Sequence, residues 1–461
     1  MGNLLFTLTV YWATKAAGIP AILFRSREMA LPEVEQNFFN SDYYAKRSLK
    51  ALCETIEKIF GAKRSVIFLR SSAFLFFAAI AARRVPARQG SACRRRNARQ
   101  DYDDVDAFVD LSLAGLDPSF LIGGIAENFG SSFHLGEGKH FILEGDEYDT
   151  AFFDKGPKFL HYFPDAIILT SVEFDHADIY KDLDAVETAF KRLVNLIPRR
   201  GRVIAFDGAV GDATESPSLE RCLAKAFCPV ERYGTGSRAH WRVTNLRLDP
   251  GRTTWTVLHN GQPWADLEFA LAGEYNVWNA TAAAVLASSC GISTAAITEA
   301  LKTFKSVKRR LEVKAQVNGI TIIDDFAHHP TAIAGTLKAL RARYAGSRLW
   351  AVLEPRSNTL RRRVLQSELA HSLAGADEVI VANVFRSEAV PENERLELSA
   401  LAAEIQQNGR PARLLADADT IVQTIAPELR GGDVVAILSN GGFGGIYEKL
   451  PARLRELMEK R

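Results

Sequence analysis

Two short apolar segments of this chain are each followed at once by acidic side chains. Residues 141–143 lead into one such cluster, and residues 166–169 lead into a second cluster that also holds an imidazole. In chain order the polar residues are Glu144, Asp146, Glu147 and Asp149, then Glu173, Asp175, His176 and Asp178. Carboxylates together with one imidazole suit Mg²⁺ held against nucleotide phosphates. Two acidic surface loops are the alternative interpretation.

A metal site of this kind needs strands that bring both clusters to one edge of a sheet. In a parallel α/β sheet the active site lies at the carboxyl ends of the strands. We therefore expect the strands that carry Glu144 and Thr170 to be neighbours in one parallel sheet. The side chains of Glu144 and His176 should then face the same cleft.

The hydrophobic pattern predicts the surrounding elements. It indicates an α/β protein with further buried strands at residues 201–206, 319–324, 350–353 and 434–438. Helices are expected at residues 185–196, at residues 280–288 and from Pro330 onward. Residues 241–269 alternate instead, and Asn260-Gly261 in their middle is a hairpin signal.

Composition sets the broad class. At 461 residues, with 47% hydrophobic and 24% charged side chains, the chain should be a soluble globular protein of about two to four domains. A net charge of +2 gives no general attraction to nucleic acid or membranes. No apolar run is long enough to cross a bilayer. The five cysteines lack metal-ligand spacing, which indicates reduced thiols in the cytoplasm.

Residues 144–155 (EGDEYDTAFFDK) and 173–179 (EFDHADI) resemble the central domain of the Mur ligases of cell-wall synthesis. The resemblance runs from about residue 114 to the C-terminus and is strongest to the members that recycle murein peptides. It implies a three-domain α/β architecture with a central P-loop-type ATPase sheet. The expected divisions are an N-terminal UDP-binding, Rossmann-like domain (1–90, not legible here), a central ATP-binding domain (91–310) and a C-terminal Rossmann-like domain (311–461).

The resemblance also implies a reaction. ATP and Mg²⁺ would convert the lactyl carboxylate of UDP-N-acetylmuramate to an acyl phosphate. The free amine of the murein tripeptide L-Ala-γ-D-Glu-meso-diaminopimelate would then attack it. Nothing in the sequence sets the oligomeric state.

Catalytic residues carry over from the family by position. Glu144 matches its principal Mg²⁺ ligand, with Asp146 and Glu147 beside it as ligands through water, and His176 matches the imidazole at the second metal. Arg310, in the basic stretch 308–310 at the domain joint, matches an arginine that reaches the γ-phosphate. The alternative for His176 is an ordinary histidine on a surface loop. The alternative for Arg310 is a basic stretch at the joint that has no functional role.

Nucleotide contacts are implied in two motifs. In residues 273–280 (GEYNVWNA), Asn279 matches an adenine contact, and Tyr275 replaces the family's histidine but could still stack on adenine. A helix N-cap explains Asn276. In residues 324–330 (DDFAHHP), Asp325 matches a nucleotide contact and His328 a support for that loop.

Substrate contacts are implied in three loops. Asn128 lies in a Gly-rich stretch that resembles the loop facing the UDP-sugar; a plain turn is the alternative. Arg356 and Asn358 of residues 354–359 (EPRSNT) stand where the family's diaminopimelate-adding ligase reads carboxylates. Residues 361–363 read as a solvated helix face. In residues 439–445 (SNGGFGG), the glycines would let the backbone approach a ligand closely. The alternative is an ordinary glycine-rich loop.

The segment before residue 114 departs from the family. Residues 1–80 show helical patterns without a Gly-rich turn after a strand, and residues 83–99 read RRVPARQGSACRRRNAR. A nucleic-acid-binding arm and a solvated linker are two interpretations of that run. A displaced reading frame fits better. When codons for residues 92–96 are read one base later, they permit the sequence LAVAG, and those for residues 97–106 permit THGKTTTTSM. These would be the strand and phosphate loop that the family requires.

In the written frame, Gln100 and Asp101 stand where the lysine and threonine of that loop belong. We therefore expect residues 91–110 not to close a phosphate loop on Glu144.

Two other functions are the alternatives to a tripeptide ligase. One is the sister ligase that adds L-alanine, and the other is a non-catalytic protein that still binds nucleotide or UDP-sugar.

Overall fold

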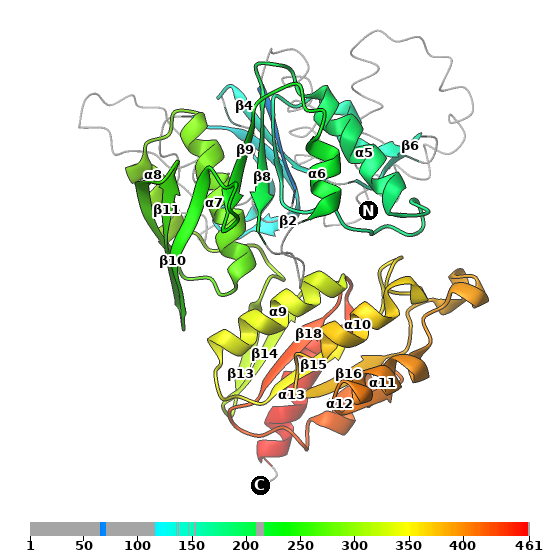
Figure 1. Cartoon of the computed structure of the whole chain (residues 1–461). Coiled ribbons are helices and arrows are strands. Elements are labelled where there is room, and N and C mark those ends of the chain that lie inside the picture. Colours follow the sequence, from blue (N-terminus) through cyan, green and yellow to red (C-terminus); the bar gives the residue numbers. More distant parts are fainter. Residues whose placement is uncertain are drawn as a thin grey trace, which may run out of the picture.

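The computed structural model describes residues 65–70, 116–134, 136, 138–145, 147–151, 154–208 and 216–459. These residues form two α/β units, each built on its own large sheet (Figure 1). The central unit is cyan to green in Figure 1, and the C-terminal unit is yellow to red. The α/β class expected from the sequence is confirmed. Domain divisions at residues 90 and 310 remain predictions.

The central unit contains a ten-stranded sheet in the order β12-β11-β10-β9-β8-β7-β1-β4-β2-β3. Its strands from β2 through β4, β1, β7 and β8 to β9 run parallel, whereas β3, β11 and β12 pair antiparallel with their neighbours. The bounds are β1 (Ser65–Arg70), β2 (Ser119–Ala126), β3 (Ser131–His134), β4 (His140–Gly145), β7 (Ala166–Leu169), β8 (Arg202–Asp207), β9 (Val230–Gly234), β10 (Trp241–Asp249), β11 (Arg252–His259) and β12 (Gln262–Phe269). A separate small sheet holds β5 (Asp149–Ala151) and β6 (Asp154–Pro157), followed by the 3-10 helix η3 (Lys158–His161).

One expectation about this sheet is wrong. The strands that precede Glu144 and Thr170, β4 and β7, share the sheet but are not neighbours, because β1 pairs in parallel with both. In register, Ile67 stands opposite Ile142 on one side and Ala166 on the other. The sequence pattern before residue 80 indicated helices and so concealed this strand. β1 also comes from within residues 1–90, the range expected to form the N-terminal domain.

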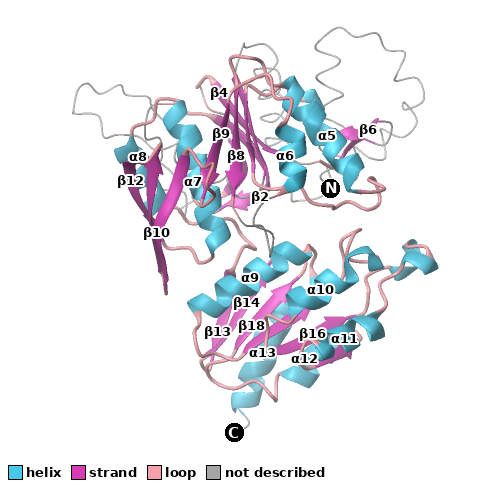
Figure 2. Ribbon diagram, viewed as in Figure 1, coloured by secondary structure: helices cyan, strands magenta, loops and turns pink. Residues whose placement is uncertain are grey.

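Helices cover the central sheet (Figure 2): α5 (Leu183–Leu196), α6 (Pro217–Leu223), α7 (Glu274–Ser289) and α8 (Thr294–Lys302). Helix α5 begins at Asp182, whose carboxylate accepts a hydrogen bond from the Ala185 amide, and it buries Phe190 and Leu193. Capping of this kind satisfies a backbone donor that the helix leaves unpaired. The alanine-rich α7 is buried along most of its length, so small side chains let it lie close to β8 and β9.

The hairpin predicted at Asn260-Gly261 is confirmed. These two residues connect β11 to β12 and adopt φ values of 51° and 83°. Such positive φ values at both turn positions match the right-handed twist of the flanking strands. Asparagine and glycine tolerate this backbone better than other residues do.

The C-terminal unit is a six-stranded sheet in the order β13-β14-β18-β15-β16-β17, parallel except for β13. Helices cover both of its faces, as in a Rossmann-like domain. The strands are β13 (Glu312–Val317), β14 (Ile320–Asp325), β15 (Leu349–Leu353), β16 (Glu378–Ala382), β17 (Ala412–Leu415) and β18 (Val434–Leu438). The helices are α9 (Pro330–Arg343), α10 (Gln366–Leu373), α11 (Leu398–Gln407), α12 (Ala418–Ile425) and α13 (Ile446–Glu459), with 3-10 turns η4 (Arg363–Leu365), η5 (Ser387–Ala389), η6 (Glu392–Glu394) and η7 (Phe443–Gly445).

Two apolar cores explain this layering. Leu337 of α9, Leu369 of α10 and Leu401 of α11 share one core on one face of the sheet. Ile421 of α12 and Leu450 of α13 share the other core on the opposite face. The inner strands β14, β15, β16 and β18 are buried on both faces, which is why they read as largely apolar runs. Within the described residues, no helix has the length and hydropathy needed to cross a membrane.

Candidate active site at the joint between the two units

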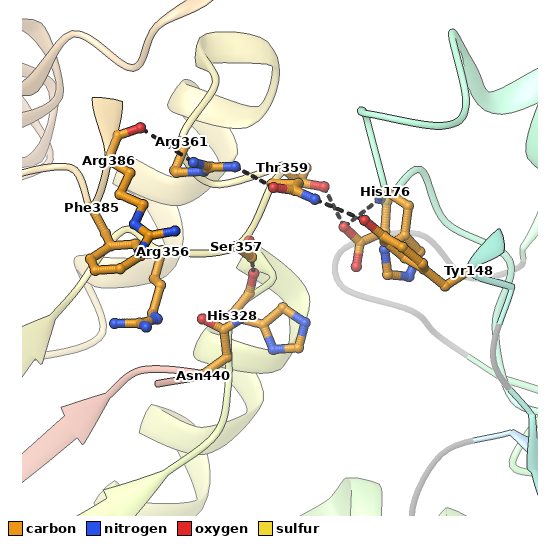
Figure 3. A pocket seen from close by; sticks show the side chains of 12 residues that line it. Tyr148, His176, His328, Arg356, Ser357, Thr359, Arg361, Phe385, Arg386 and Asn440 are labelled. Carbon is orange, nitrogen blue, oxygen red and sulfur yellow. Dashed lines mark hydrogen bonds between the residues drawn. The ribbon is translucent and has the colours of Figure 1, made fainter. Parts of the chain in front are cut away.

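A pocket of about 320 Å³ opens between the two units (Figure 3). The central unit contributes Tyr148, Asp175 and His176. The C-terminal unit contributes residues that follow β14, β15, β16 and β18. The pocket therefore lies at the carboxyl ends of four strands of one sheet, where α/β proteins bind ligands.

His176 occupies a constrained turn in this pocket. Its φ of 54° is unusual for a residue other than glycine and costs about 1–2 kcal/mol. The His176 amide donates a 2.7 Å hydrogen bond to Asp175 Oδ1, and the ring meets Tyr148 edge-on with centroids 4.9 Å apart. Burial opposes ionisation of Asp175, but the neighbouring His176 and the Thr359 hydroxyl outweigh it and lower the pKa of that carboxyl. A turn that carries this strain and is supported at several points is typical of a functional site.

The carboxylate beside His176 belongs to Glu147. His176 Nε2 lies 3.6 Å from Glu147 Oε1, and Glu147 is buried. The Oε2 atom of Glu144 instead accepts a 2.5 Å hydrogen bond from the Gly123 amide. A carboxylate and an imidazole fit Mg²⁺ if phosphate and water complete the shell. Among the described residues no group of three or more metal-ligating side chains is assembled. The assignment of Glu144 and His176 as ligands remains a prediction.

The two arginines at the joint, Arg309 and Arg310, differ sharply in their contacts. Arg309 is fully engaged: its Nε lies 3.0 Å from Asp324 Oδ2, and its Nη2 donates to the Ser439 carbonyl at 2.7 Å and to Tyr447 Oη at 2.9 Å. Arg310 lies 5.5 Å from the Phe326 ring and makes no hydrogen bond or ion pair within the described residues. Arg309 therefore has a structural role, and contact of Arg310 with the γ-phosphate remains a prediction.

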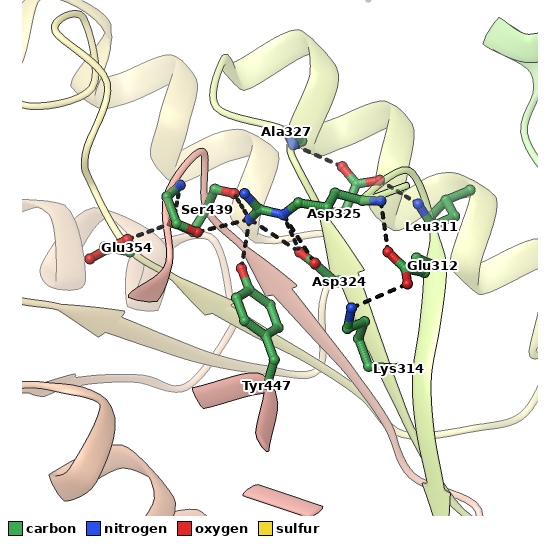
Figure 4. Close-up of polar contacts among 11 residues, drawn as sticks. Leu311, Glu312, Lys314, Asp324, Asp325, Ala327, Glu354, Ser439 and Tyr447 are labelled. Carbon is green, nitrogen blue, oxygen red and sulfur yellow. Dashed lines mark hydrogen bonds and ion pairs between the residues drawn. The ribbon is translucent and has the colours of Figure 1, made fainter. Parts of the chain in front are cut away.

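Asp325 is committed to the protein's own backbone. Its carboxylate accepts hydrogen bonds from the amides of Leu311 at 2.8 Å and Ala327 at 2.9 Å, and from the Thr336 hydroxyl at 3.1 Å (Figure 4). It is 1% exposed. These bonds fix the joint and the following loop, and a nucleotide contact by Asp325 remains a prediction.

His328 presents its ring to the pocket. Its Nδ1 lies 2.9 Å from the Phe326 carbonyl oxygen, which holds the ring's orientation. Burial lowers the pKa of His328 below its ordinary value. The lowered pKa favours the neutral form of the ring, and a supporting role of His328 in the nucleotide loop remains a prediction.

The predicted adenine contacts lie on α7. Tyr275 packs against α9 of the C-terminal unit, where a side chain at Gly335 would come within 3.5 Å of its ring. Asn279 is buried at 5% exposure. Asn276 does not cap the helix, because Gly273 is the N-cap and the Asn276 amide donates back to the Ala272 carbonyl at 2.7 Å. Contacts of Tyr275 and Asn279 with adenine remain predictions.

Asn128 is tied to the segment after α8. Its Nδ2 donates to the Thr303 carbonyl at 2.9 Å, and its Oδ1 accepts from the Lys305 amide at 2.7 Å. Both polar atoms of the side chain therefore hold two distant segments together. Recognition of the UDP-sugar by Asn128 remains a prediction.

Arg356 is held in a fixed position in the pocket. Its guanidinium lies 3.7 Å from the centre of the Phe385 ring and 3.4 Å from Glu354 Oε1. Glu354 in turn accepts a 2.5 Å hydrogen bond from the Ser439 hydroxyl. On its other side is Gly441, where a Cβ atom would come within 2.1 Å of Arg356 Nε. The glycine-rich loop therefore approaches an arginine closely, and that arginine is preorganised.

Two further arginines were missed from the sequence. Arg361 was expected on a solvated helix face, but it precedes η4, lines the pocket and donates to Asn358 Oδ1 and to the Arg386 carbonyl. Arg386 lines the same pocket with a left-handed φ of 49°. Neither guanidinium forms an ion pair with a described residue. The clearest available signal was their position after two parallel strands, the same signal that indicated Arg356.

Asn358 and Thr359 cross from one unit to the other. Asn358 Nδ2 donates to Tyr148 Oη at 2.9 Å and to Asp178 Oδ2 at 2.6 Å. Its side-chain amide bridges the joint in this arrangement, and substrate binding by Asn358 remains a prediction. Residues 91–110, where the phosphate loop was expected to be missing, lie outside the described residues.

Comparisons with known proteins agree with this architecture. The Mur ligase middle domain profile matches residues 133–287, and the Mur ligase glutamate ligase domain profile matches residues 309–441. The chain is 40% identical to the UDP-N-acetylmuramate–L-alanyl-γ-D-glutamyl-meso-2,6-diaminoheptandioate ligase of Escherichia coli K12, over 74% of this chain and 70% of that protein. It is 32% identical to the UDP-N-acetylmuramate–L-alanine ligase of Desulfitobacterium hafniense, over 74% and 72%.

A solved structure shows the same relation. The murein peptide ligase of Psychrobacter arcticus superimposes with a TM-score of 0.59 and 30% sequence identity. The match covers 87% of this chain and 80% of that one.

Proposed function

The chain belongs to the Mur ligase family, and we propose that it joins the tripeptide L-Ala-γ-D-Glu-meso-diaminopimelate to UDP-N-acetylmuramate at the expense of ATP. Its product would return salvaged peptide to peptidoglycan synthesis. ATP and Mg²⁺ are the cofactors that the family uses. We place the reaction in the cytoplasm, where ATP and UDP-linked precursors are available.

The observation that carries this proposal is the charge of the pocket. Arg356, Arg361 and Arg386 all line it. The tripeptide carries three free carboxylates: one on D-glutamate and two on diaminopimelate. Guanidinium groups pair with carboxylates in a bidentate way. L-Alanine has a single carboxylate and would leave two of the three guanidiniums without a substrate carboxylate, so the pocket favours the tripeptide.

The reaction needs two steps. A lactyl carboxylate oxygen attacks the γ-phosphorus of ATP, and ADP leaves with the broken P–O bond's electron pair. The product of this step is an acyl phosphate. The tripeptide amine then attacks its carbonyl carbon, phosphate leaves, and the nitrogen loses a proton. Bound Mg²⁺ would neutralise charge on the phosphates during the first step.

The described residues have defined tasks in these steps. Glu147 and His176 would hold the metal, and Arg310 would meet charge that develops on the γ-phosphate. Arg356, held by Phe385 and Glu354, would orient the peptide. Docking of the two units over the pocket would exclude water that competes with the amine for the acyl phosphate.

Two alternatives remain specific to this chain. Relatives that add L-alanine are also similar to it, at 32% identity. A non-catalytic protein that binds nucleotide or UDP-sugar is favoured by Gln100 and Asp101 in the written frame, because an acidic side chain near a triphosphate repels it.

A substrate competition assay tests the choice between ligases. The protein from a gene with the single-base shift restored is given UDP-N-acetylmuramate, ATP, and equal amounts of labelled tripeptide and L-alanine. The tripeptide product should dominate by at least tenfold. Equal incorporation of L-alanine would contradict the proposal.

A further inference from the structure

The loop that carries Arg356 and the turn that carries His176 meet through one hydroxyl group. Thr359 belongs to the C-terminal unit, is 1% exposed, and reaches across the joint. Its Oγ1 donates a 2.5 Å hydrogen bond to Asp175 Oδ1 and accepts one of 3.3 Å from the Ala177 amide. A hydroxyl provides one donor and acceptor lone pairs, and here both capacities are used.

These bonds converge on the backbone around His176. The Asp175 oxygen that Thr359 contacts also accepts from the His176 amide. The Ala177 amide on the other side of His176 points at the same hydroxyl. The left-handed backbone of His176 is therefore bracketed by two groups that share one threonine of the other unit.

We propose that Thr359 is a positioning residue, whose hydroxyl completes the His176 turn only when the C-terminal unit is docked. The imidazole then stands beside the Glu147 carboxylate, with Nε2 3.6 Å from Oε1, and the two side chains would hold the metal of the proposed function. The central unit alone leaves the Ala177 amide without this acceptor. This inference relies on the proposed function only for the task that it assigns to His176.

A second bridge shows that the coupling extends across the pocket. Arg361 donates to the Arg386 carbonyl and to Asn358 Oδ1, and Asn358 donates to Tyr148 of the central unit (Figure 3). Tyr148 packs against the His176 ring. The Arg361–Asn358 side of the pocket and the His176 turn are thus connected by side-chain contacts. Thr359 contacts the Ala177 amide within the turn, and His329 contacts the Phe174 carbonyl just before it.

Hydrogen exchange of the Ala177 amide tests this directly. The full chain is measured by mass spectrometry at single-amide resolution, without nucleotide or peptide. Thr359→Val keeps the shape but loses the hydroxyl, so Ala177 should exchange about tenfold faster, the effect of losing a typical hydrogen bond. Thr359→Ser keeps a hydroxyl and should stay within about twofold of the parent protein.

A matched control separates positioning from docking. The Thr331 hydroxyl also crosses the joint, to Glu173, but does not touch the turn. Thr331→Val should leave Ala177 exchange within about twofold of the parent. The Ala185 amide, which Asp182 caps, is an internal reference that should not change in any variant.

Three results would overturn the inference. They are unchanged exchange of Ala177 in Thr359→Val, equal acceleration in Thr331→Val, and acceleration of Ala185 together with Ala177, which would indicate general loosening. The measurement involves no ligation step. A protein that fails to ligate but shows the expected exchange would contradict the proposed function and leave this inference standing.

Discussion

At the scale of single residues, the backbone of a neighbouring loop determines where a pocket side chain can lie. Arg356 lies between the Phe385 ring and the backbone of Gly441, and a Cβ atom at position 441 would come within 2.1 Å of Arg356 Nε. The arginine can occupy its place only because residue 441 is a glycine. Loss of that glycine should therefore resemble loss of the arginine.

We predict that Gly441→Ala weakens tripeptide binding by about 1.5–3 kcal/mol, because the displaced guanidinium loses a charged contact with a carboxylate. Calorimetry of the full chain with tripeptide measures it. Gly442→Ala is the matched control, since nothing lies within 4 Å of a Cβ atom there. Equal affinities of the two variants would show that Arg356 does not need this space.

The variant Arg356→Ala tests the contact between Arg356 and the tripeptide more directly. Tripeptide affinity should fall by about 1.5–3 kcal/mol while affinity for UDP-N-acetylmuramate stays nearly unchanged. Arg363→Ala, which alters a half-exposed arginine paired with Glu397, is the control and should change neither affinity. If tripeptide binding to Arg356→Ala matches the parent, another residue reads the peptide.

Residue types and spacing predicted some of this site and missed the rest. Arg356, His176 and His328 were recognised because each follows a strand within a distinctive motif, and the structure places them in one pocket. Arg361 and Arg386 carry no motif, and only the fold brings them there. Glu147 was ranked below Glu144, because the sequence cannot show which carboxylate of a cluster faces the imidazole.

At the scale of secondary-structure elements, an ion pair on a buried carboxylate connects helices α5 and α6 and stabilises the fold. Glu187 of α5 is 1% exposed and receives hydrogen bonds from Arg221 of α6 and from Lys191. The Arg221 guanidinium, opposed by burial and helped by Lys191, lowers the pKa of Glu187 to about 2. A carboxyl with a lowered pKa stabilises the fold above its unfolded pKa and loses that contribution as pH falls through the folded value.

We predict that Glu187→Gln destabilises the chain by about 3 kcal/mol at pH 7, because it removes the buried carboxylate to which Arg221 and Lys191 donate and whose pKa folding lowers. The difference from the parent should shrink as pH falls from about 4.5 toward 2, because the unfolded chain takes up a proton at Glu187 in this range while the folded chain keeps the carboxylate ionised. Thermal unfolding across that pH range measures it. Glu456→Gln, an exposed carboxylate on α13, should behave like the parent, and a difference for Glu187→Gln that does not vary with pH would contradict the assignment.

Most elements were predictable where the period of the pattern was clear. The strands at β8, β14, β15 and β18 are continuous apolar runs, the helix at α5 has an amphipathic repeat, and the Asn260-Gly261 turn is a strong local signal. The exception is β1, which separates β4 from β7. Strand order depends on contacts between distant segments, and a short strand such as β1 (SVIFLR) carries no local signal of which strands it pairs with.

At the scale of the whole molecule, two α/β units are joined at a polar site. The joint is fixed by Arg309 and Asp325, which are fully paired, and Arg310 is left available there. Such a division suits an enzyme that must bring an ATP site and a peptide site together and then release its product. The remaining requirement is a phosphate loop, which the written frame lacks at Gln100 and Asp101.

The measurement that tests the account most directly is tripeptide ligation by two purified proteins. One is the chain as written, and the other comes from a gene with the single-base shift restored, so that it encodes AGTHGKTT, together with an intact N-terminal domain. Both receive ATP, Mg²⁺, UDP-N-acetylmuramate and labelled tripeptide. We predict product from the restored protein and none from the chain as written. Ligation by the chain as written would contradict the displaced frame, and no ligation by the restored protein would contradict the proposed function.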